Sequence, residues 1–255
     1  MSARQILHAS LLIVAGTLLG APSYAGETTK VAVASNFTDA AKEIAEAFAE
    51  ATEHHAVLSF GASGQIYTQV TQGAPFEVFL SADDVRPAQA VREGHGVEGS
   101  VFTYAIGRLV LYSADEGMVS GPETLTDARF NKIAIANPQT APYGKAATKT
   151  MRSLGIYEAL RDKIVQGQNI GQTFQFIETG NAELGFVAYG QVSQTEKGSR
   201  WLVPQEHYSP IRQDAVLLKL GEKSPAAVAF IEFLKSAAAA AIIEKHGYAR
   251  SEQPS

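Results

Sequence analysis

Short apolar segments alternate with helical segments along this chain, and this alternation constrains the fold more than any other feature. The first block of the pattern predicts buried strands at 30–35, 56–60 and 76–82, and helices at 37–52, 63–73 and about 85–94. Strands that alternate with helices form βαβ units. We therefore expect a largely parallel sheet with helices on its faces.

A second block of the same kind follows. It predicts strands at 108–114, 132–137, 183–189, 200–204 and 214–220, and helices near 143–154, 171–179 and 225–247. The last helix has a Ser-Pro start signal and ends near Gly247. Two α/β blocks with a C-terminal return are compatible with two lobes between which the chain crosses twice, although the pattern alone does not prove the crossing.

The first 25 residues have the pattern of a cleavable export signal. Arg4 supplies positive charge, residues 11–21 form an apolar core too short to span a bilayer, and residues 23–25 are suited to a signal peptidase. Cleavage after Ala25 leaves a mature chain that begins at Gly26. The alternative is an uncleaved N-terminal membrane anchor.

Composition narrows the compartment and the class of partner. The 255 residues include no cysteine, which excludes disulfides, thiolate metal sites and a lipid-modified N-terminal cysteine. An exported, unlipidated chain without disulfides indicates a bacterial periplasm. The formal net charge of -5 argues against nucleic-acid or membrane-surface binding, because no basic stripe is present to neutralise phosphates.

Four strand-to-helix junctions share one pattern, in which an apolar strand leads through small or hydroxyl residues into a helix. They are "VAVASNFTDAAKE", "LSFGASGQIYTQ", "IAIANPQTAPYGKAA" and "VQGQNIGQTFQF". Ligands of open α/β sheets bind at the carboxyl ends of strands, against helix N-termini that favour anions. The junctions offer neutral donors for such a ligand: Ser35, Asn36, Ser63, Tyr143 and the backbone around Ile170.

None of these junctions has a carboxylate or an arginine at its core, and Lys145 is the only nearby cation. Taken singly, Lys145 has the pattern of a solvated side chain, Ser35 that of a helix cap, and Tyr143 that of a packed ring. The chain has no phosphate-binding P-loop and no Gly-x-Ser-x-Gly nucleophile elbow. Adjacent acids at Asp83 and Asp84 are better suited to cap a helix than to act as an acid/base pair. We therefore predict that the chain is not an enzyme.

Taken together, the junctions resemble the periplasmic molybdate-binding proteins of ABC transporters, members of the solute-binding protein family. The resemblance rests on "VAVASNFTDA", "SFGASGQIYTQVTQGAPFEVFLSADD", "FTYAIGRLVLYS", "IAIANPQTAPYGKAA", "NIGQTF", "AELGFVAYGQ" and "AAIIEKHGY". It extends along essentially the whole mature chain. Its most specific piece is Gly-Ala-Pro-x-x-Val-Phe-x-Ser-Ala-Asp at residues 73–83.

The resemblance implies a fold and a ligand set. The fold is the two-lobed type II periplasmic-binding-protein fold, α/β in class, with a mixed, mainly parallel sheet in each lobe and a hinged cleft between them. Lobe I is expected near 26–106 plus 209–255, and lobe II near 107–208. The implied oxyanion ligands are Ser35, Asn36, Ser63, Tyr143 and the backbone N–H of Ile170. One branch of the family uses a tyrosine at the position of Ala188; here the tyrosine is Tyr189, one residue later, which puts its contact in doubt.

The implied function is capture of molybdate, and also of tungstate, in the cleft and delivery to an ABC permease in the membrane. The resemblance implies no cofactor, no metal site beyond the oxyanion ligands, no nucleic acid, and a monomer. A site of donors suits a fully deprotonated oxyanion, whereas a protonated phosphate also needs an acceptor. Sulfate or another tetrahedral oxyanion remains the alternative ligand. An enzyme or an anion sensor on the same scaffold is a further alternative.

Overall fold

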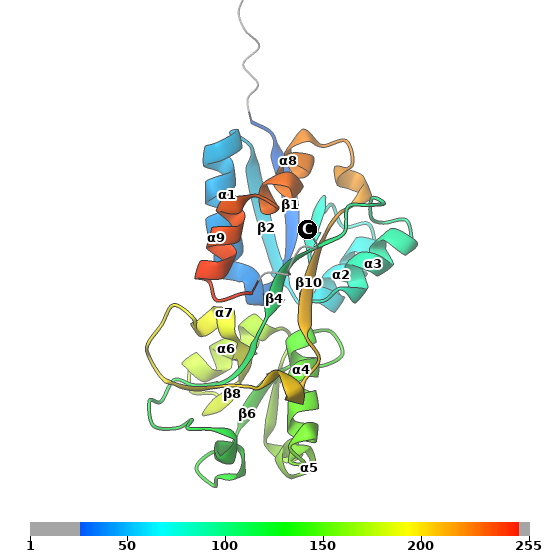
Figure 1. Ribbon diagram of the computed structural model, residues 1–255. Coiled ribbons are helices and arrows are strands. Elements are labelled where there is room, and N and C mark those ends of the chain that lie inside the picture. The colour runs from blue at the N-terminus through cyan, green and yellow to red at the C-terminus, as the bar shows by residue number, and fades with distance from the viewer. Residues whose placement is uncertain (1–25, 250–255) are drawn as a thin grey trace, which may run out of the picture.

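The computed structural model describes residues 26–249, and within them the chain forms two α/β lobes, one above the other in Figure 1. The predicted export signal at 1–25 lies outside the described residues, as do residues 250–255. Each lobe is built on one five-stranded sheet. The two sheets, rather than one continuous sheet, confirm the predicted division into two α/β blocks.

The sheet of the first lobe has the strand order β2-β1-β3-β10-β4. Its strands are β1 (Thr28–Ala34), β2 (His55–Gly61), β3 (Val78–Leu80), β4 (Phe102–Gly107) and β10 (Ile211–Leu217). Strand β1 pairs in parallel with β2 and β3, whereas β10 is antiparallel to both β3 and β4. The sheet is therefore mixed and mainly parallel, as expected.

The sheet of the second lobe repeats this arrangement in the order β7-β6-β8-β5-β9. Its strands are β5 (Leu109–Ser113), β6 (Ile133–Ala136), β7 (Ile164–Gly167), β8 (Leu184–Ala188) and β9 (Ser199–Leu202). Strand β6 is parallel to β7 and β8, and β5 is antiparallel to β8 and β9. In each sheet the opposed strand is the one that the chain enters directly after crossing from the other lobe.

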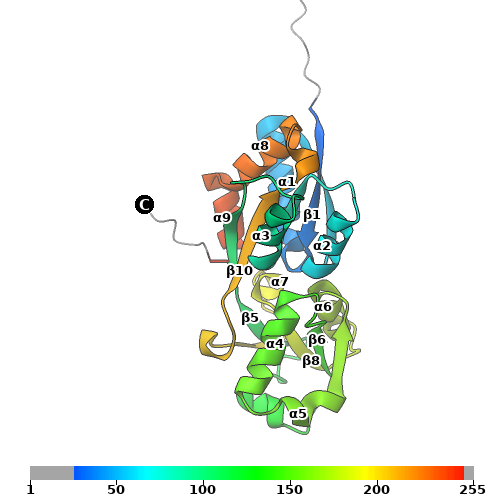
Figure 2. The same cartoon turned by 90° about the vertical axis from the view of Figure 1, so that its right-hand side faces the viewer.

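Helices cover both faces of both sheets (Figures 1 and 2). The helices of the first lobe are α1 (Thr38–Thr52), α2 (Ser63–Thr71), α3 (Val85–Arg92), α8 (Pro225–Leu234) and α9 (Ala237–Lys245). Those of the second lobe are α4 (Pro142–Ser153), α5 (Tyr157–Leu160), α6 (Ile170–Glu178) and α7 (Tyr189–Val192). Short 3-10 turns lie at Ser35–Phe37, Pro122–Thr126, Arg161–Lys163, Gln205–His207 and Lys219–Gly221.

The alternation of side chains along buried strands explains the two layers of helices. In β1, Val31 and Val33 join the core formed with α1, α8 and α9, whereas Ala32 faces the core formed with α2 and α3. This is the period of two expected for a strand buried on both faces. Phe48 of α1 and Phe230 of α8 meet edge-to-face at 5.2 Å between ring centroids, which joins two helices far apart in sequence.

The single helix predicted over 225–247 is wrong. The chain forms α8 and α9 instead, at an angle of 61°, because Ser236 starts a new helix by accepting a hydrogen bond from the Ala239 N–H at 3.2 Å. Among the described residues, no single helix is long and apolar enough to cross a membrane, and α8 with α9 meet that criterion only as this bent pair. Strand β4 was not predicted from the pattern.

The chain crosses between the lobes from β4 to β5 and returns from β9 to β10 (Figure 1). Strands β1 to β4 and β10 belong to one sheet, and β5 to β9 to the other. We keep the limits of 26–106 plus 209–255 and of 107–208 as the proposed residue boundaries of the lobes. Because β1, β2, β6 and β7 end where the lobes meet, their junctions with the following helices face a common space.

Candidate functional site

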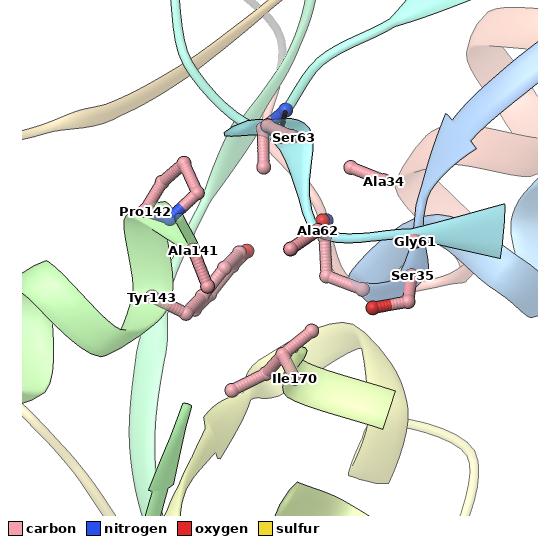
Figure 3. Close-up of a pocket in the computed structure, with 11 residues that line it drawn as sticks. Ala34, Ser35, Gly61, Ala62, Ser63, Ala141, Pro142, Tyr143 and Ile170 are labelled. Carbon is pink, nitrogen blue, oxygen red and sulfur yellow. Dashed lines mark hydrogen bonds between the residues drawn. The ribbon is translucent and has the colours of Figure 1, made fainter. Parts of the chain in front are cut away.

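A small pocket lies between the two lobes, and all five predicted site residues line it (Figure 3). Its lining consists of Ala34, Ser35, Asn36, Gly61, Ala62, Ser63, Ala82, Ala141, Pro142, Tyr143 and Ile170. Residues from the four predicted junctions, which are spread over more than half the chain, thus meet around one space, together with Ala82 from the junction between β3 and α3. The side chains of Ser35, Ser63, Tyr143 and Ile170 reach it from different directions.

Helix starts position these residues. Ser35 and Asn36 lie in the 3-10 turn between β1 and α1, and Ser63 is the first residue of α2. From the other lobe, Tyr143 is the second residue of α4 and Ile170 the first of α6. Backbone N–H groups in a first turn have no acceptor within their own helix, and the dipole there is positive. The pocket therefore collects N–H donors and the positive ends of several helices.

The three hydroxyl groups of the pocket share one hydrogen-bonding pattern: each accepts a hydrogen bond from an N–H group of the protein. The Ala82 N–H donates to Ser63 Oγ at 2.9 Å, the Gly171 N–H to Ser35 Oγ at 3.3 Å, and Gln213 Nε2 to the Tyr143 hydroxyl at 3.4 Å. Within residues 26–249, none of these hydroxyls donates to a protein acceptor. Their own hydrogens therefore remain available to a molecule in the pocket.

Asn36 has a different role from the serines. Its Nδ2 group donates to Gln213 Oε1 at 2.7 Å and to the Tyr248 hydroxyl at 3.2 Å, and the Tyr248 hydroxyl donates to the Asn36 carbonyl at 2.6 Å. Both amide hydrogens are therefore used inside the protein. Asn36 Oδ1 is buried without a partner. The group that Asn36 has left to offer a ligand as a donor is its backbone N–H.

Sequence reasoning missed Gln213 and Tyr248, the partners that hold Asn36. Gln213 is fully buried in β10, and Tyr248 is 4% exposed. A signal for Gln213 was present, because Ile211, Gln213 and Ala215 alternate along a strand that is buried at each of these positions. The predicted strand began at residue 214, so this inward-facing amide was left outside it.

Among residues 26–249, no charged side chain lines the pocket. Lys145 is exposed, which agrees with its interpretation as a solvated cation. Ser63 and Tyr143 are each only 1% exposed. Burial, together with the neighbouring Tyr248 and Tyr104, raises the pKa of Tyr143 well above its ordinary value, although the hydrogen bond from Gln213 acts in the opposite direction. Tyr143 thus remains a neutral hydroxyl donor throughout the physiological pH range.

The remaining candidates from the sequence lie outside the pocket. Tyr189 packs its ring against the guanidinium of Arg108, 4.3 Å from the ring centroid. Asp83 Oδ1 accepts the Arg86 N–H at 3.0 Å at the start of α3, so this carboxylate caps a helix. Among residues 26–249, no group of three or more His, Cys, Asp or Glu side chains is arranged to hold a metal ion.

Direct hydrogen bonds join the lobes around the pocket. The Gly64 N–H of α2 donates to the Thr140 carbonyl at 2.9 Å, and Arg86 Nη2 donates to the Gln139 carbonyl at 3.4 Å. The bond from Gly171 to Ser35 also crosses between lobes. A Cβ atom on Gly64 would lie only 3.0 Å from Thr140 Cα, so a glycine is required for this approach. The structure is a closed arrangement in which the pocket is buried.

We predict that the buried tyrosines resist ionisation. Burial is the main cause that raises the pKa of Tyr104 and Tyr143. Since the folded pKa exceeds the unfolded one, their contribution to stability is complete below about pH 10 and is lost as the pH rises above it. At about pH 11, the folded protein should show fewer tyrosinates by absorbance than the urea-unfolded protein, and Tyr143→Phe should narrow that difference. Equal ionisation in both states, with the fold intact by circular dichroism, would contradict this.

Comparison with known proteins agrees with this geometry. Residues 29–249 match the family model of the bacterial extracellular solute-binding proteins. The chain is 53% identical over 239 residues to a molybdate-binding protein of Rhodobacter capsulatus, with 94% of each chain covered. It is 48% identical over 245 residues to one from Azotobacter vinelandii, covering 94% of this chain and 97% of that one.

A solved structure supports the same assignment. The periplasmic molybdate-binding protein of Azotobacter vinelandii superposes with a TM-score of 0.85 at 39% identity, covering 88% of this chain and all of that one. This match confirms the two-lobed fold that the sequence predicted. The chain therefore belongs to the family of bacterial extracellular solute-binding proteins, which bind solutes in the periplasm or outside the cell and are not enzymes.

Proposed function

We propose that this protein captures molybdate in the pocket between its lobes and delivers it to the membrane permease of an ABC transporter. The observation that carries the proposal is the polarity of the pocket: it presents hydroxyl hydrogens and first-turn N–H groups, and no charged side chain. The ligands in this proposal are Ser35, the backbone N–H of Asn36, Ser63, Tyr143 and the backbone N–H of Ile170.

A pocket of donors selects among anions by their protonation. Molybdate at neutral pH is a tetrahedral dianion without a proton, so all its oxygens accept hydrogen bonds. Phosphate retains a proton at that pH and needs an acceptor, and an unmet donor in a buried site is penalised. Tungstate has the same shape and charge as molybdate, so we include it as a ligand. The molybdate-binding relatives support the choice of molybdate.

Neutral donors are sufficient to hold a buried dianion. A hydrogen bond to a charged group contributes about 1.5–3 kcal/mol. Each helix N-terminus adds about 0.3–1 kcal/mol through its dipole. Several such donors, contributed by both lobes, offset the desolvation of the anion without an arginine or lysine. Discrimination between molybdate and sulfate then depends on the size of the pocket, because the two anions have the same charge and the same acceptors.

We expect tight one-to-one binding of molybdate and tungstate, and no heat from sulfate or phosphate. The measurement is isothermal titration of the mature protein at neutral pH, after any carried-over ligand has been removed. Binding of sulfate alone would retain the oxyanion site and overturn molybdate as its ligand. Absence of heat from all four anions would show that the pocket has been assigned to the wrong class of ligand.

Ser63→Ala should weaken molybdate binding by more than about tenfold, because the variant lacks one hydrogen bond to a charged ligand. It also removes the acceptor of the buried Ala82 N–H, so the ligand-free protein should lose about 1–3 kcal/mol of stability.

Ser199→Ala is the matched control for this change. Ser199 is also buried, and its Oγ accepts the Val119 N–H at 2.8 Å and donates to the Asp115 carbonyl, but it lies in β9 and does not line the pocket. This variant loses two hydrogen bonds, so it should lose at least as much stability as Ser63→Ala while it retains wild-type affinity by titration. If both variants bind molybdate equally well, Ser63 is not a ligand.

Molybdate should compact the protein, because its proposed ligands lie on both lobes and a bridging ligand favours the closed state. The radius of gyration from small-angle scattering should therefore fall when saturating molybdate is added to the ligand-free protein. An equal concentration of phosphate serves as the control for ionic strength and should leave the radius unchanged. An unchanged radius with molybdate bound would argue against closure as the signal read by the permease.

A further inference from the structure

We propose that Gln213 is a positioning residue of the anion site, which directs the hydroxyl hydrogen of Tyr143 toward the ligand. This inference rests on the proposed function. Gln213 does not line the pocket, and it lies in β10, the strand by which the chain returns to the first lobe. It acts on the ligand only through its neighbours.

The contacts of Gln213 fix which end of its amide faces Tyr143. Its Oε1 accepts from Asn36 Nδ2 at 2.7 Å. The Tyr104 hydroxyl lies 3.3 Å from the same oxygen, but its single hydrogen is shared with the Ser81 carbonyl, which lies closer at 3.0 Å. The Asn36 amide is the donor that holds the oxygen on this side. Nε2 is therefore turned toward the Tyr143 hydroxyl, to which it donates at 3.4 Å. The amide has no exposed surface, so water does not compete for these bonds.

A tyrosine hydroxyl is otherwise ambivalent, since it has one hydrogen to donate and lone pairs to accept with. The N–H of Gln213 occupies a lone pair of the Tyr143 oxygen, so the hydroxyl hydrogen must point elsewhere. In Figure 3 the hydroxyl end of the Tyr143 ring extends toward the middle of the pocket. The hydrogen is thereby presented to the pocket, where an oxyanion needs it.

Packing also restricts the tip of Tyr143. A Cβ atom on Gly107, at the end of β4, would lie 2.1 Å from the Tyr143 hydroxyl oxygen and 2.8 Å from Gln213 Nε2. The hydroxyl therefore lies against both strands that connect the lobes, Gly107 in β4 and Gln213 in β10. The absence of a side chain at Gly107 leaves the space in which Gln213 and Tyr143 meet.

The test is a double-mutant cycle on the full mature protein, with molybdate as the probe and isothermal titration as the measurement. Gln213→Met removes the amide and retains a side chain of similar length. It should weaken binding by about five- to tenfold in the wild-type background. In the Tyr143→Phe background, where there is no hydroxyl to orient, the same change should alter the affinity by less than about twofold.

Gln213→Glu provides the second variant if the apolar side chain prevents folding. Its carboxylate still accepts from Asn36, but offers Tyr143 an acceptor that draws the hydroxyl hydrogen away from the ligand. The added negative charge repels the anion in both backgrounds and so cancels in the cycle. The loss of molybdate affinity beyond this charge effect should again occur only when the Tyr143 hydroxyl is present.

The outcomes separate the two proposals. An equal loss in both backgrounds, or no loss in either, would overturn the positioning role while leaving molybdate capture intact. Failure of the unaltered protein to bind molybdate would overturn the proposed function and this inference with it. A loss confined to the background that contains the Tyr143 hydroxyl is the result that a merely structural role does not produce, and it supports the positioning role.

Discussion

The structure depends on the burial of polar groups between two lobes without a counter-charge. An anion bound in this pocket, as we propose, would lose its hydration, and among the described residues that line the pocket only uncharged groups are present to replace it. A hydroxyl group rotates about its C–O bond and can point either its hydrogen or its lone pairs into the pocket. An uncharged site can therefore bind an anion only when each hydroxyl is held with its hydrogen toward the ligand. The N–H groups of Ala82, Gly171 and Gln213 provide that restraint by donating to the hydroxyl oxygens. The two-lobed fold brings these N–H groups and the hydroxyls together.

Repetition of one strand order in both sheets makes this convergence possible. Parallel strands end at the same edge of a sheet, and the helices that follow them begin there. Because the lobes face each other at these edges, each contributes first-turn residues: Ser35 and Ser63 from one lobe, Tyr143 and Ile170 from the other. The strands that cross between the lobes pass directly behind the pocket. Gly107 and Gln213 on these strands are consequently in contact with a residue of the site.

The sequence predicted those pocket residues that lie in the turn between one strand and the next helix. Each residue of the predicted site follows a strand within a few residues, so the strand-to-helix junctions and the family resemblance were sufficient to predict residues that line the pocket. Their role as ligands stays a prediction. Gln213 is different, because its partners Asn36 and Tyr143 lie 177 and 70 residues away in sequence and are brought to it by sheet order. The break between α8 and α9 was missed for a related reason. Ser236 interrupts an apolar run of helical composition with a cap that composition alone does not reveal.

The restraints on the hydroxyls also link the polarity of the pocket to lobe closure. The bond from Ala82 to Ser63 lies within the first lobe and is independent of the other. The bonds from Gly171 to Ser35 and from Gln213 to Tyr143 each join one lobe to the other. Separation of the lobes therefore removes two of these three restraints, and the freed hydroxyls can then turn toward water. The orientation of the Ser35 and Tyr143 hydroxyls is thus a property of the closed arrangement, since their N–H partners reach them only when the lobes meet.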